Sequence, residues 1–206
     1  MYNPGHFTES DPDEIGRILE DHPLATLVAS STSGLVANHL PLVLRDALLF
    51  GHVALANPLH ADIANGAAVL AIFQGGNAYI SPNWYPTKTA THRVVPTWNY
   101  QVAHVHGRIR WLHEPAAKRR IVSLLTNRHE RALNGPDAWK MADAPADYLA
   151  EMIDKIVAFE IAIERIEAKS KLNQNHPAEN RIAVSNKLAA LGATELAQAM
   201  GRSLPE

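Results

Sequence analysis

The pattern of hydrophobic and polar residues near the start of the chain predicts one helix followed by strands. Asp11-Pro12-Asp13-Glu14 combines a helix N-cap, a proline at the first helical position and a capping glutamate at the third. A short helix is therefore expected from there to Asp21-His22-Pro23. A meander of antiparallel strands is expected next, over residues 24–30, 35–44 and 47–54.

The middle of the chain alternates short helices, strands and one long loop. Asn57-Pro58 predicts a helix of one to two turns that Gly66 closes, and a buried strand should follow over 67–73. Gln74-Gly75-Gly76-Asn77 predicts a turn into a strand over 78–81. Residues 82–96 contain three prolines and no lasting periodicity, which indicates a long loop. Loops of that length inside a compact domain are usually functional or disordered.

The remaining segments return to regular structure. A strand is expected over 100–112, a helix from Glu114-Pro115 and a second helix over about 146–154. Val157, Phe159, Ile161 and Ile163 alternate with other residues, which is typical of a strand with one face on the core. Beyond Lys169 the chain becomes polar, and helical sequence follows over about 178–200 with a turn at Gly192.

Six or seven strands in two groups separated by helices indicate an α+β fold with a predominantly antiparallel sheet. A barrel is expected, because a sheet that closes on itself pairs the strand edges that would otherwise be exposed. At 206 residues the chain has the length of one generous domain.

Composition narrows the functional classes. The chain is 47% hydrophobic and 19% charged, so it can form a sizeable core. It contains no cysteine, which excludes disulfides, thiolate metal sites and a cysteine nucleophile and fits a reducing cytoplasm. No export signal and no run of about 20 apolar residues is visible, so a cytoplasmic protein without a membrane partner is expected.

The charge of the chain argues against strong binding of nucleic acid. The net charge is −2 and the pI is about 6.6, whereas nucleic-acid-binding domains usually carry a basic face. A basic run at Lys118-Arg119-Arg120, continued by Arg128 and Arg131, is interpreted as the solvated side of an amphipathic helix. Rossmann, P-loop and nucleophile-elbow motifs are absent.

Histidines offer one alternative chemistry. His104 and His106 point to one face of a strand because side chains alternate with a period of two. With His113 or His92 they could ligate a metal, although no carboxylate lies beside them in sequence to complete a facial triad. Ordinary core or interface histidines are the competing and preferred interpretation.

Aromatic residues flank the long loop in two dense clusters, Tyr79 to Tyr85 and Val95 to Tyr100. Any one of these rings could simply fill a core. Together they are typical of the wall of a site for a flat aromatic ligand, because pockets are mostly apolar with a few placed polar groups.

At this level of detail the sequence resembles the PaiB-like family of FMN-binding negative transcriptional regulators. The resemblance runs in order along almost the whole chain. The matching segments are Met1-Tyr2 to Phe7, Asn38-His39-Leu40-Pro41, Gly51-His52-Val53, Ala56-Asn57-Pro58, Phe73, Tyr79 to Tyr85, Val95 to Tyr100, His104 to Gly107, Val157 to Ile161, Lys171-Leu172 and Gln174-Asn175.

The resemblance implies an antiparallel split β-barrel with flanking helices and a helical C-terminal tail, dimeric, with FMN in a cleft shared between subunits. Residues 1–170 would form the FMN-binding split-barrel domain and 171–206 a polar segment and helical extension of it. It also implies a set of cofactor-binding residues. The strand that runs along the flavin ring would contain Asn38, His39, Leu40 and Pro41. The candidates for binding the phosphate are Asn57, His60 and Lys88. The pocket would be completed by Thr97, Trp98 and Asn99, and by Lys171, Gln174 and Asn175 from the polar tail.

Two main functions follow as alternatives. The first is a homodimeric FMN flavoprotein with oxidoreductase or redox-linked regulatory activity, in which the cofactor supplies the redox chemistry and a small-molecule substrate or nicotinamide reductant is the partner. The second is a DNA-binding negative regulator, for which the only local support is the pair of C-terminal helices around Gly192. No residue stands out as a required acid or base.

Overall fold

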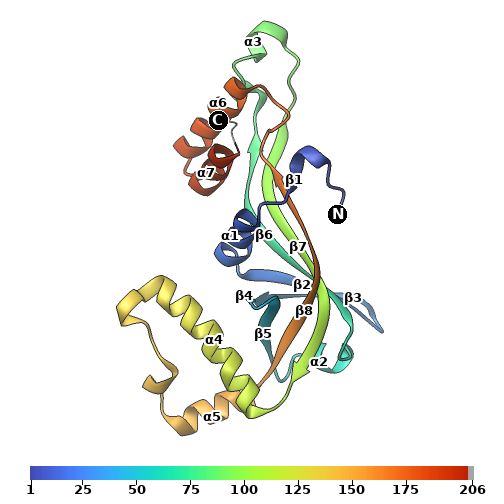
Figure 1. The fold of residues 1–206 in the computed structure, drawn as a ribbon, viewed down its shortest axis with the longest axis vertical. Coiled ribbons are helices and arrows are strands. Elements are labelled where there is room, and N and C mark those ends of the chain that lie inside the picture. The colour runs from blue at the N-terminus through green and yellow to red at the C-terminus, as the bar shows by residue number, and fades with distance from the viewer. Residues whose placement is uncertain (204–206) are drawn as a thin grey trace. The chain divides into compact units, whose positions relative to one another are not determined.

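The computed structural model describes residues 1–203 and confirms an α+β fold built on an antiparallel sheet. The sheet has eight strands in the order β3-β2-β6-β7-β8-β5-β4, and β1 pairs with β8 (Figure 1). The strands are β1 Thr8–Glu9, β2 Leu24–Ser31, β3 Gly34–Pro41, β4 Val43–Arg45, β5 Leu48–Ala54, β6 Ala68–Ile80, β7 Thr97–Leu112 and β8 Ile156–Lys171.

Helices flank the strands and form the C-terminal tail. The α-helices are α1 Pro12–Asp21, α2 Leu59–Asp62, α3 Lys88–Thr91, α4 Pro115–Asn134, α5 Ala146–Asp154, α6 Ala178–Ala190 and α7 Thr194–Arg202. Four short 3-10 helices are η1 Gly5–Phe7, η2 Pro82–Trp84, η3 Gly135–Asp137 and η4 Met141–Asp143. Within residues 1–203, none of the helices combines the length and the apolar character needed to cross a membrane.

The chain divides into two compact units. Unit 1 contains residues 1–18, 74–103 and 167–206, and unit 2 contains residues 19–73 and 104–166. The long strands β6, β7 and β8 each contribute residues to both units. The predicted boundary between residues 170 and 171 stays a prediction.

Unit 2 holds the strand meander that the alternation of hydrophobic residues predicts. In β2 every second residue from Ala25 to Ala29 is buried, because one face of the strand lies on the core. β5 and β8 pair along seven residues, from Leu48 opposite Ala162 to Ala54 opposite Ile156. On β7, a Cβ added to Gly107 would lie 2.3 Å from the carbonyl oxygen of Ala162, so only glycine fits there.

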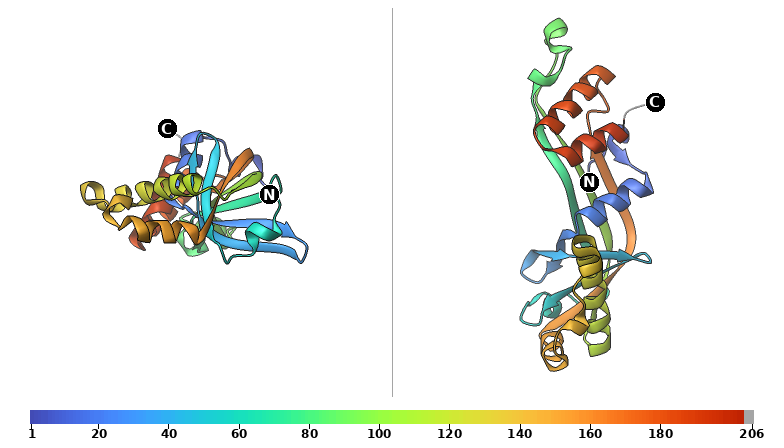
Figure 2. Two further views of the ribbon diagram at one scale, coloured as in Figure 1. Left: turned by 90° about the horizontal axis from the view of Figure 1, so that it is seen from below. Right: turned by 90° about the vertical axis from the view of Figure 1, so that its left-hand side faces the viewer.

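Unit 1 has its own core, formed where the C-terminal helices cover residues of the strands. Ile80, Tyr85 and Leu172 pack with apolar residues of α6 and α7, among them Val184 and Leu196. Figures 1 and 2 show α6 and α7 side by side. Hydrogen bonds also connect α1 to α7 in unit 1. The buried Glu14 of α1 accepts them from Arg202 of α7 at 2.9 Å.

Several sequence-based boundaries were wrong. The strand expected over 35–44 is interrupted at Leu42, and the short strand β1 before α1 was not predicted. The described part of the chain has eight strands and not six or seven. The turn expected at 74–77 does not occur, because β6 continues from Ala68 to Ile80. The helix that Gly66 was expected to close already ends at Asp62, and the last strand runs on to Lys171.

Candidate functional site

Three of the predicted cofactor-binding residues come together in unit 1, around Lys171. This lysine is the last residue of β8, and its Nζ donates hydrogen bonds to Oγ1 of Thr97 and, at 2.8 Å, to the carbonyl oxygen of Trp98, both at the start of β7. The Trp98 ring is 51% exposed and makes an edge contact with the half-exposed ring of Tyr79, with 6.2 Å between ring centroids. The cluster therefore combines a cation, a hydroxyl group and two accessible aromatic rings.

A second lysine increases the positive charge at this place. Lys169 and Lys171 are two residues apart on β8, so their side chains leave the strand on the same face. The Lys169 ammonium lies 5.4 to 5.9 Å from the ring centroids of Tyr2, Phe7 and Tyr100, a cation–π arrangement. Burial and the like charge of Lys169 lower the pKa of Lys171. An anion next to Lys171 would relieve this repulsion.

The other predicted residues of unit 1 have different surroundings. Asn99 is fully buried, with its Nδ2 3.5 Å from Sδ of Met200 and its Oδ1 without a hydrogen-bond partner. Gln174 folds back on the backbone, since its Oε1 accepts from the Leu172 amide at 2.7 Å. Lys88 donates to Oδ1 of Asn83 at 2.5 Å in the long loop. Asn175 is exposed in the segment between β8 and α6.

In unit 2 two predicted residues are joined directly. Asn57 donates from Nδ2 to Oδ1 of Asn38 at 2.9 Å, and its own Oδ1 accepts from the amide of Leu59 at 2.9 Å. Asn57 therefore caps the start of α2 and ties it to β3. The ring of His60, one residue further on, has its Nε2 2.9 Å from the carbonyl oxygen of Leu55.

The strand β3 carries the remaining predicted residues, and none of its residues is buried. It pairs with β2 and lies at the end of the strand order. His39 is exposed, and its Nδ1 lies 3.0 Å from Oγ1 of Thr26, while Leu40 is half-buried and Pro41 exposed. An edge strand of this kind presents backbone N–H and C=O groups that can pair with a ligand.

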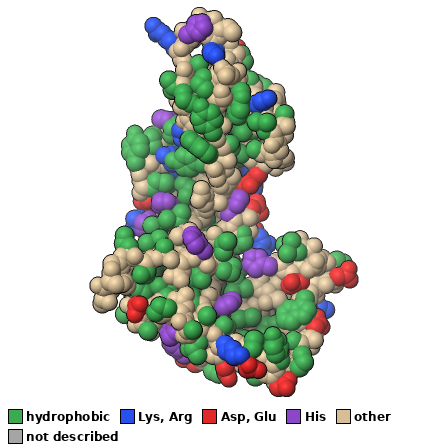
Figure 3. All heavy atoms as spheres, turned by 180° about the vertical axis from the view of Figure 1, so that it is seen from behind, with side chains coloured by type: hydrophobic (Ala, Val, Ile, Leu, Met, Phe, Trp, Pro, Cys, Tyr) green, Lys and Arg blue, Asp and Glu red, His purple; other side chains and the backbone are tan. Residues whose placement is uncertain are grey.

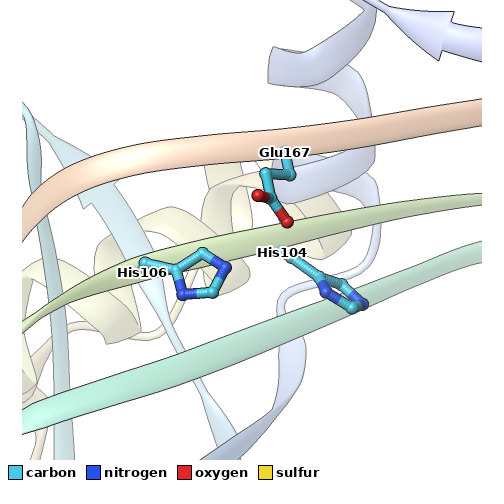
Figure 4. Close-up of side chains that lie close together, drawn as sticks. All are labelled: His104, His106 and Glu167. Atoms are coloured by element: carbon cyan, nitrogen blue, oxygen red, sulfur yellow. The ribbon is translucent and has the colours of Figure 1, made fainter. Parts of the chain in front are cut away.

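One of the two histidines proposed as metal ligands, His106, lies beside a cationic side chain. His104 and His106 project from β7, and Figure 4 shows their side chains together with that of Glu167 on β8. Nε2 of His106 lies 3.2 Å from the guanidinium of Arg165, and the Glu167 carboxylate forms an ion pair with the N-terminal ammonium at 2.9 Å. A neighbouring guanidinium disfavours a bound cation. The metal-binding alternative stays a prediction.

Two members of the aromatic and cationic cluster were missed or left unassigned from sequence. Lys169 was not predicted, although its spacing from Lys171 on a strand was the available signal. Tyr79 belonged to an aromatic cluster that was expected to form the wall of a ligand site, but it was not named among the cofactor-binding residues. Both contribute to the same group of side chains in unit 1.

Comparison with known proteins places this chain among flavin-binding relatives. The family model described as "Putative FMN-binding domain" matches residues 1–165. The chain is 31% identical to the "Protease synthase and sporulation protein PAI 2" of Bacillus subtilis over 179 residues, which are 85% of this chain and 83% of that protein.

Solved structures support the fold. The FAD and heme binding protein from Mycobacterium smegmatis is similar with a TM-score of 0.60 and 18% identity, over 85% of this chain and 78% of that one. The flavocytochrome Anf3 from Azotobacter vinelandii is similar with a TM-score of 0.54 and 14% identity, over 80% of this chain and 69% of that one. The expected split-barrel fold class and the expected cofactor, FMN, are both confirmed. The chain belongs to the PaiB-like family of FMN-binding domains.

Proposed function

We propose that this protein is a homodimeric FMN flavoprotein that acts as an oxidoreductase, accepting reducing equivalents from a nicotinamide nucleotide and passing them to a small molecule. The observation that carries the proposal is the cluster of Lys171, Thr97 and Trp98 in unit 1. Bound FMN supplies hydride and electron transfer, while the protein binds and orients it.

The chemistry of the cluster fits a phosphate group. Lys171 donates only to neutral acceptors, the hydroxyl of Thr97 and a backbone carbonyl, so no carboxylate in these hydrogen bonds offsets its charge. Lys169 adds a like charge nearby. A phosphate oxygen could accept from the Lys171 ammonium and from the Thr97 hydroxyl, and such charge-assisted hydrogen bonds are about twice as strong as neutral ones.

The same cluster fits a flat aromatic ring. About half of Trp98 and of Tyr79 is exposed to solvent. Burial of such large aromatic rings is energetically favourable, so a ligand that covers them gains binding energy. An isoalloxazine ring stacked on Trp98 would remove this apolar surface from water. In the proposal Lys171 and Thr97 hold the phosphate and Trp98 orients the ring.

In unit 2, β3 is the second candidate for contact with the flavin. Asn57 fixes the side-chain oxygen of Asn38, which leaves the two N–H groups of Asn38 to donate to a carbonyl of a ligand. Backbone carbonyl groups of β3 that do not pair with β2 offer further acceptors. His60 has one ring nitrogen, Nδ1, left to face a ligand. FMN titration of single variants decides which of the two groups contacts the flavin.

The first experiment measures FMN binding by fluorescence quenching with wild type, Lys171→Met and Lys187→Met. Lys187 is an exposed lysine of α6 in the same unit and serves as the matched control. Loss of one charge-assisted contact of roughly 1.5 to 3 kcal/mol should weaken binding by about 10- to 100-fold in Lys171→Met. Equal weakening in both variants would refute the assignment of Lys171.

The second experiment tests the reaction and the dimer. Anaerobic addition of NADH or NADPH to the FMN-loaded protein should bleach the flavin absorbance. Flavin that stays oxidised would refute the oxidoreductase assignment but not FMN binding.

The proposed dimer is tested by light scattering, which should give twice the chain mass of 22.6 kDa. Leu24 and Leu35 at the β2–β3 edge are 66% and 80% exposed, and Figure 3 shows many hydrophobic side chains on the surface, which favours a covering partner.

The two arginines of the C-terminal helices give the DNA-binding alternative no support. Arg181 of α6 is buried and donates to the backbone and the side chain of Ser203. Arg202 of α7 forms an ion pair with Glu14 at 2.9 Å. Both arginines are therefore engaged by other groups of unit 1, Arg181 in its interior and Arg202 in an ion pair with a buried carboxylate, whereas a DNA-binding face presents cations that are available to phosphates.

A further inference from the structure

A large groove in unit 2 lies between the β4–β5 hairpin and one face of α4. Its volume is about 1070 Å³. On the helix side it is lined by Arg120, Leu124, Asn127 and Arg131, which are three or four residues apart and therefore share one face of α4. The lining residues all belong to unit 2, whereas the Lys171 cluster belongs to unit 1.

The groove has an excess of positive charge, although the whole chain has a net charge of −2. Its lining includes the arginines 45, 120, 128 and 131 but only two carboxylates, Glu20 and Asp46. Arg128 pairs with Glu20 at 2.8 Å and Arg45 with Asp46 at 3.5 Å. Across residues 1–203, Arg120 and Arg131 form no ion pair, so two guanidinium groups face the groove uncompensated.

The floor of the groove is apolar. Leu42, Phe50 and Ile121 line it and are buried, and Leu44 is 38% exposed at its side. The guanidinium of Arg120 lies 5.6 Å from the centroid of the Phe50 ring, which holds the charge directly beside this apolar surface. The groove therefore offers a positive charge and an apolar surface next to each other.

From this geometry we infer that the groove binds a small organic anion, with a phosphate or carboxylate group on Arg120 and Arg131 and an apolar or aromatic body against Leu44 and Phe50. The volume is at the upper end of that of small-molecule pockets, about 300 to 1000 Å³, so a ligand of up to nucleotide size can enter. This site goes beyond the proposed flavin site and does not depend on it.

The test uses 1-naphthyl phosphate as the probe and the FMN-loaded protein, with binding measured by titration calorimetry. We expect saturable binding that Arg120→Ala and Arg131→Ala each weaken by about tenfold, in line with the loss of one hydrogen bond to a charged group. Arg119→Ala removes the same charge from an exposed position of α4 that does not line the groove, and it should leave the affinity unchanged. Inorganic phosphate, which lacks the apolar body, should bind at least tenfold more weakly.

Three results would overturn the inference: no binding of the probe at millimolar concentration, the same loss in Arg119→Ala as in Arg120→Ala, or release of FMN by the probe. Release would mean that the probe occupies the flavin site. Arg120→Lys keeps the charge and should retain most of the affinity, and melting curves of all variants separate lost binding from lost folding.

Discussion

The Glu14 carboxylate should increase the free energy of unfolding. Its removal tests whether the hydrogen bonds around it stabilise unit 1. Burial alone would raise its pKa, but hydrogen bonds from Arg202, Gln101 and Arg17 outweigh the burial and lower the pKa from 4.5 to about 2. The donors lie 2.7 to 2.9 Å from the carboxylate oxygens. The charged form is therefore favoured in the folded state.

The magnitude follows from the linkage between protonation and folding. The gap between a pKa of 4.5 and one of about 2 is worth about 3 kcal/mol. Because the side chains of Arg17 and Arg202 are 43% and 41% exposed, solvent screening reduces this to about 2 kcal/mol. Since the pKa is depressed in the folded state, the stabilisation is fully present above pH 4.5 and is lost as the pH falls toward 2.

The measurement is urea unfolding of wild type and Glu14→Gln at pH 7 and at pH 3. We expect Glu14→Gln to lower the free energy of unfolding by about 2 kcal/mol at pH 7 and by less at pH 3. Glu20→Gln is the matched control, because Glu20 pairs with Arg128 at the surface, where an ion pair is worth about 1 kcal/mol or less. Equal losses in both variants, or a Glu14→Gln loss that does not shrink in acid, would refute the reasoning.

Three further predictions concern unit 2, each checked by urea or thermal unfolding. Gly107→Ala should destabilise by about 2 kcal/mol or more, because its Cβ would lie 2.3 Å from the Ala162 carbonyl oxygen; an unchanged midpoint would contradict this close approach. Ala47→Gly should stabilise by about 1 kcal/mol, since Ala47 has a φ of 60° in the β4–β5 turn, and a loss of stability would be the opposite result. Trp111→Phe should cost about 1 kcal/mol, because it removes the buried 2.7 Å hydrogen bond from Nε1 to the Ile63 carbonyl oxygen.

Elements with strong local signals were predicted well. α1 runs from Pro12 to Asp21 as the capping residues indicated, and α5 covers Ala146–Asp154 as the spacing of its apolar residues indicated. These signals work because they depend on residues within one or two turns of each other.

The errors arose where distant segments decide the local structure. Gly75 and Gly76 suggested a turn, yet they lie inside β6, and a Cβ on Gly76 would already be 3.5 Å from side-chain atoms of Glu195 and Leu196. This segment therefore packs against α7, a contact that the local sequence does not reveal. The end of β8 was missed because Glu164 and Arg165 are both exposed, so alternation is lost there.

The candidate site depends on contacts that no spacing rule gives. Asn38 and Asn57 are joined across 19 positions, and Lys171 reaches Thr97 across 74. Only the family resemblance selected these residues in advance. The surroundings of Asn99, by contrast, needed the structure, because its burial beside Met200 follows from the packing of α7.

The division of the chain has a consequence for biosynthesis. Unit 1 is assembled from three segments that are far apart in the sequence, so it stays incomplete until the segment that starts at residue 167 has been synthesised. Until then Ile80 and Tyr85 have no cover, because Leu172, Val184 and Leu196 have not emerged from the ribosome. All residues of unit 2 precede residue 167, so the nascent chain can fold this unit first. The apolar residues of unit 1 stay exposed during that time, and a chaperone can cover them until the remaining segment has been synthesised.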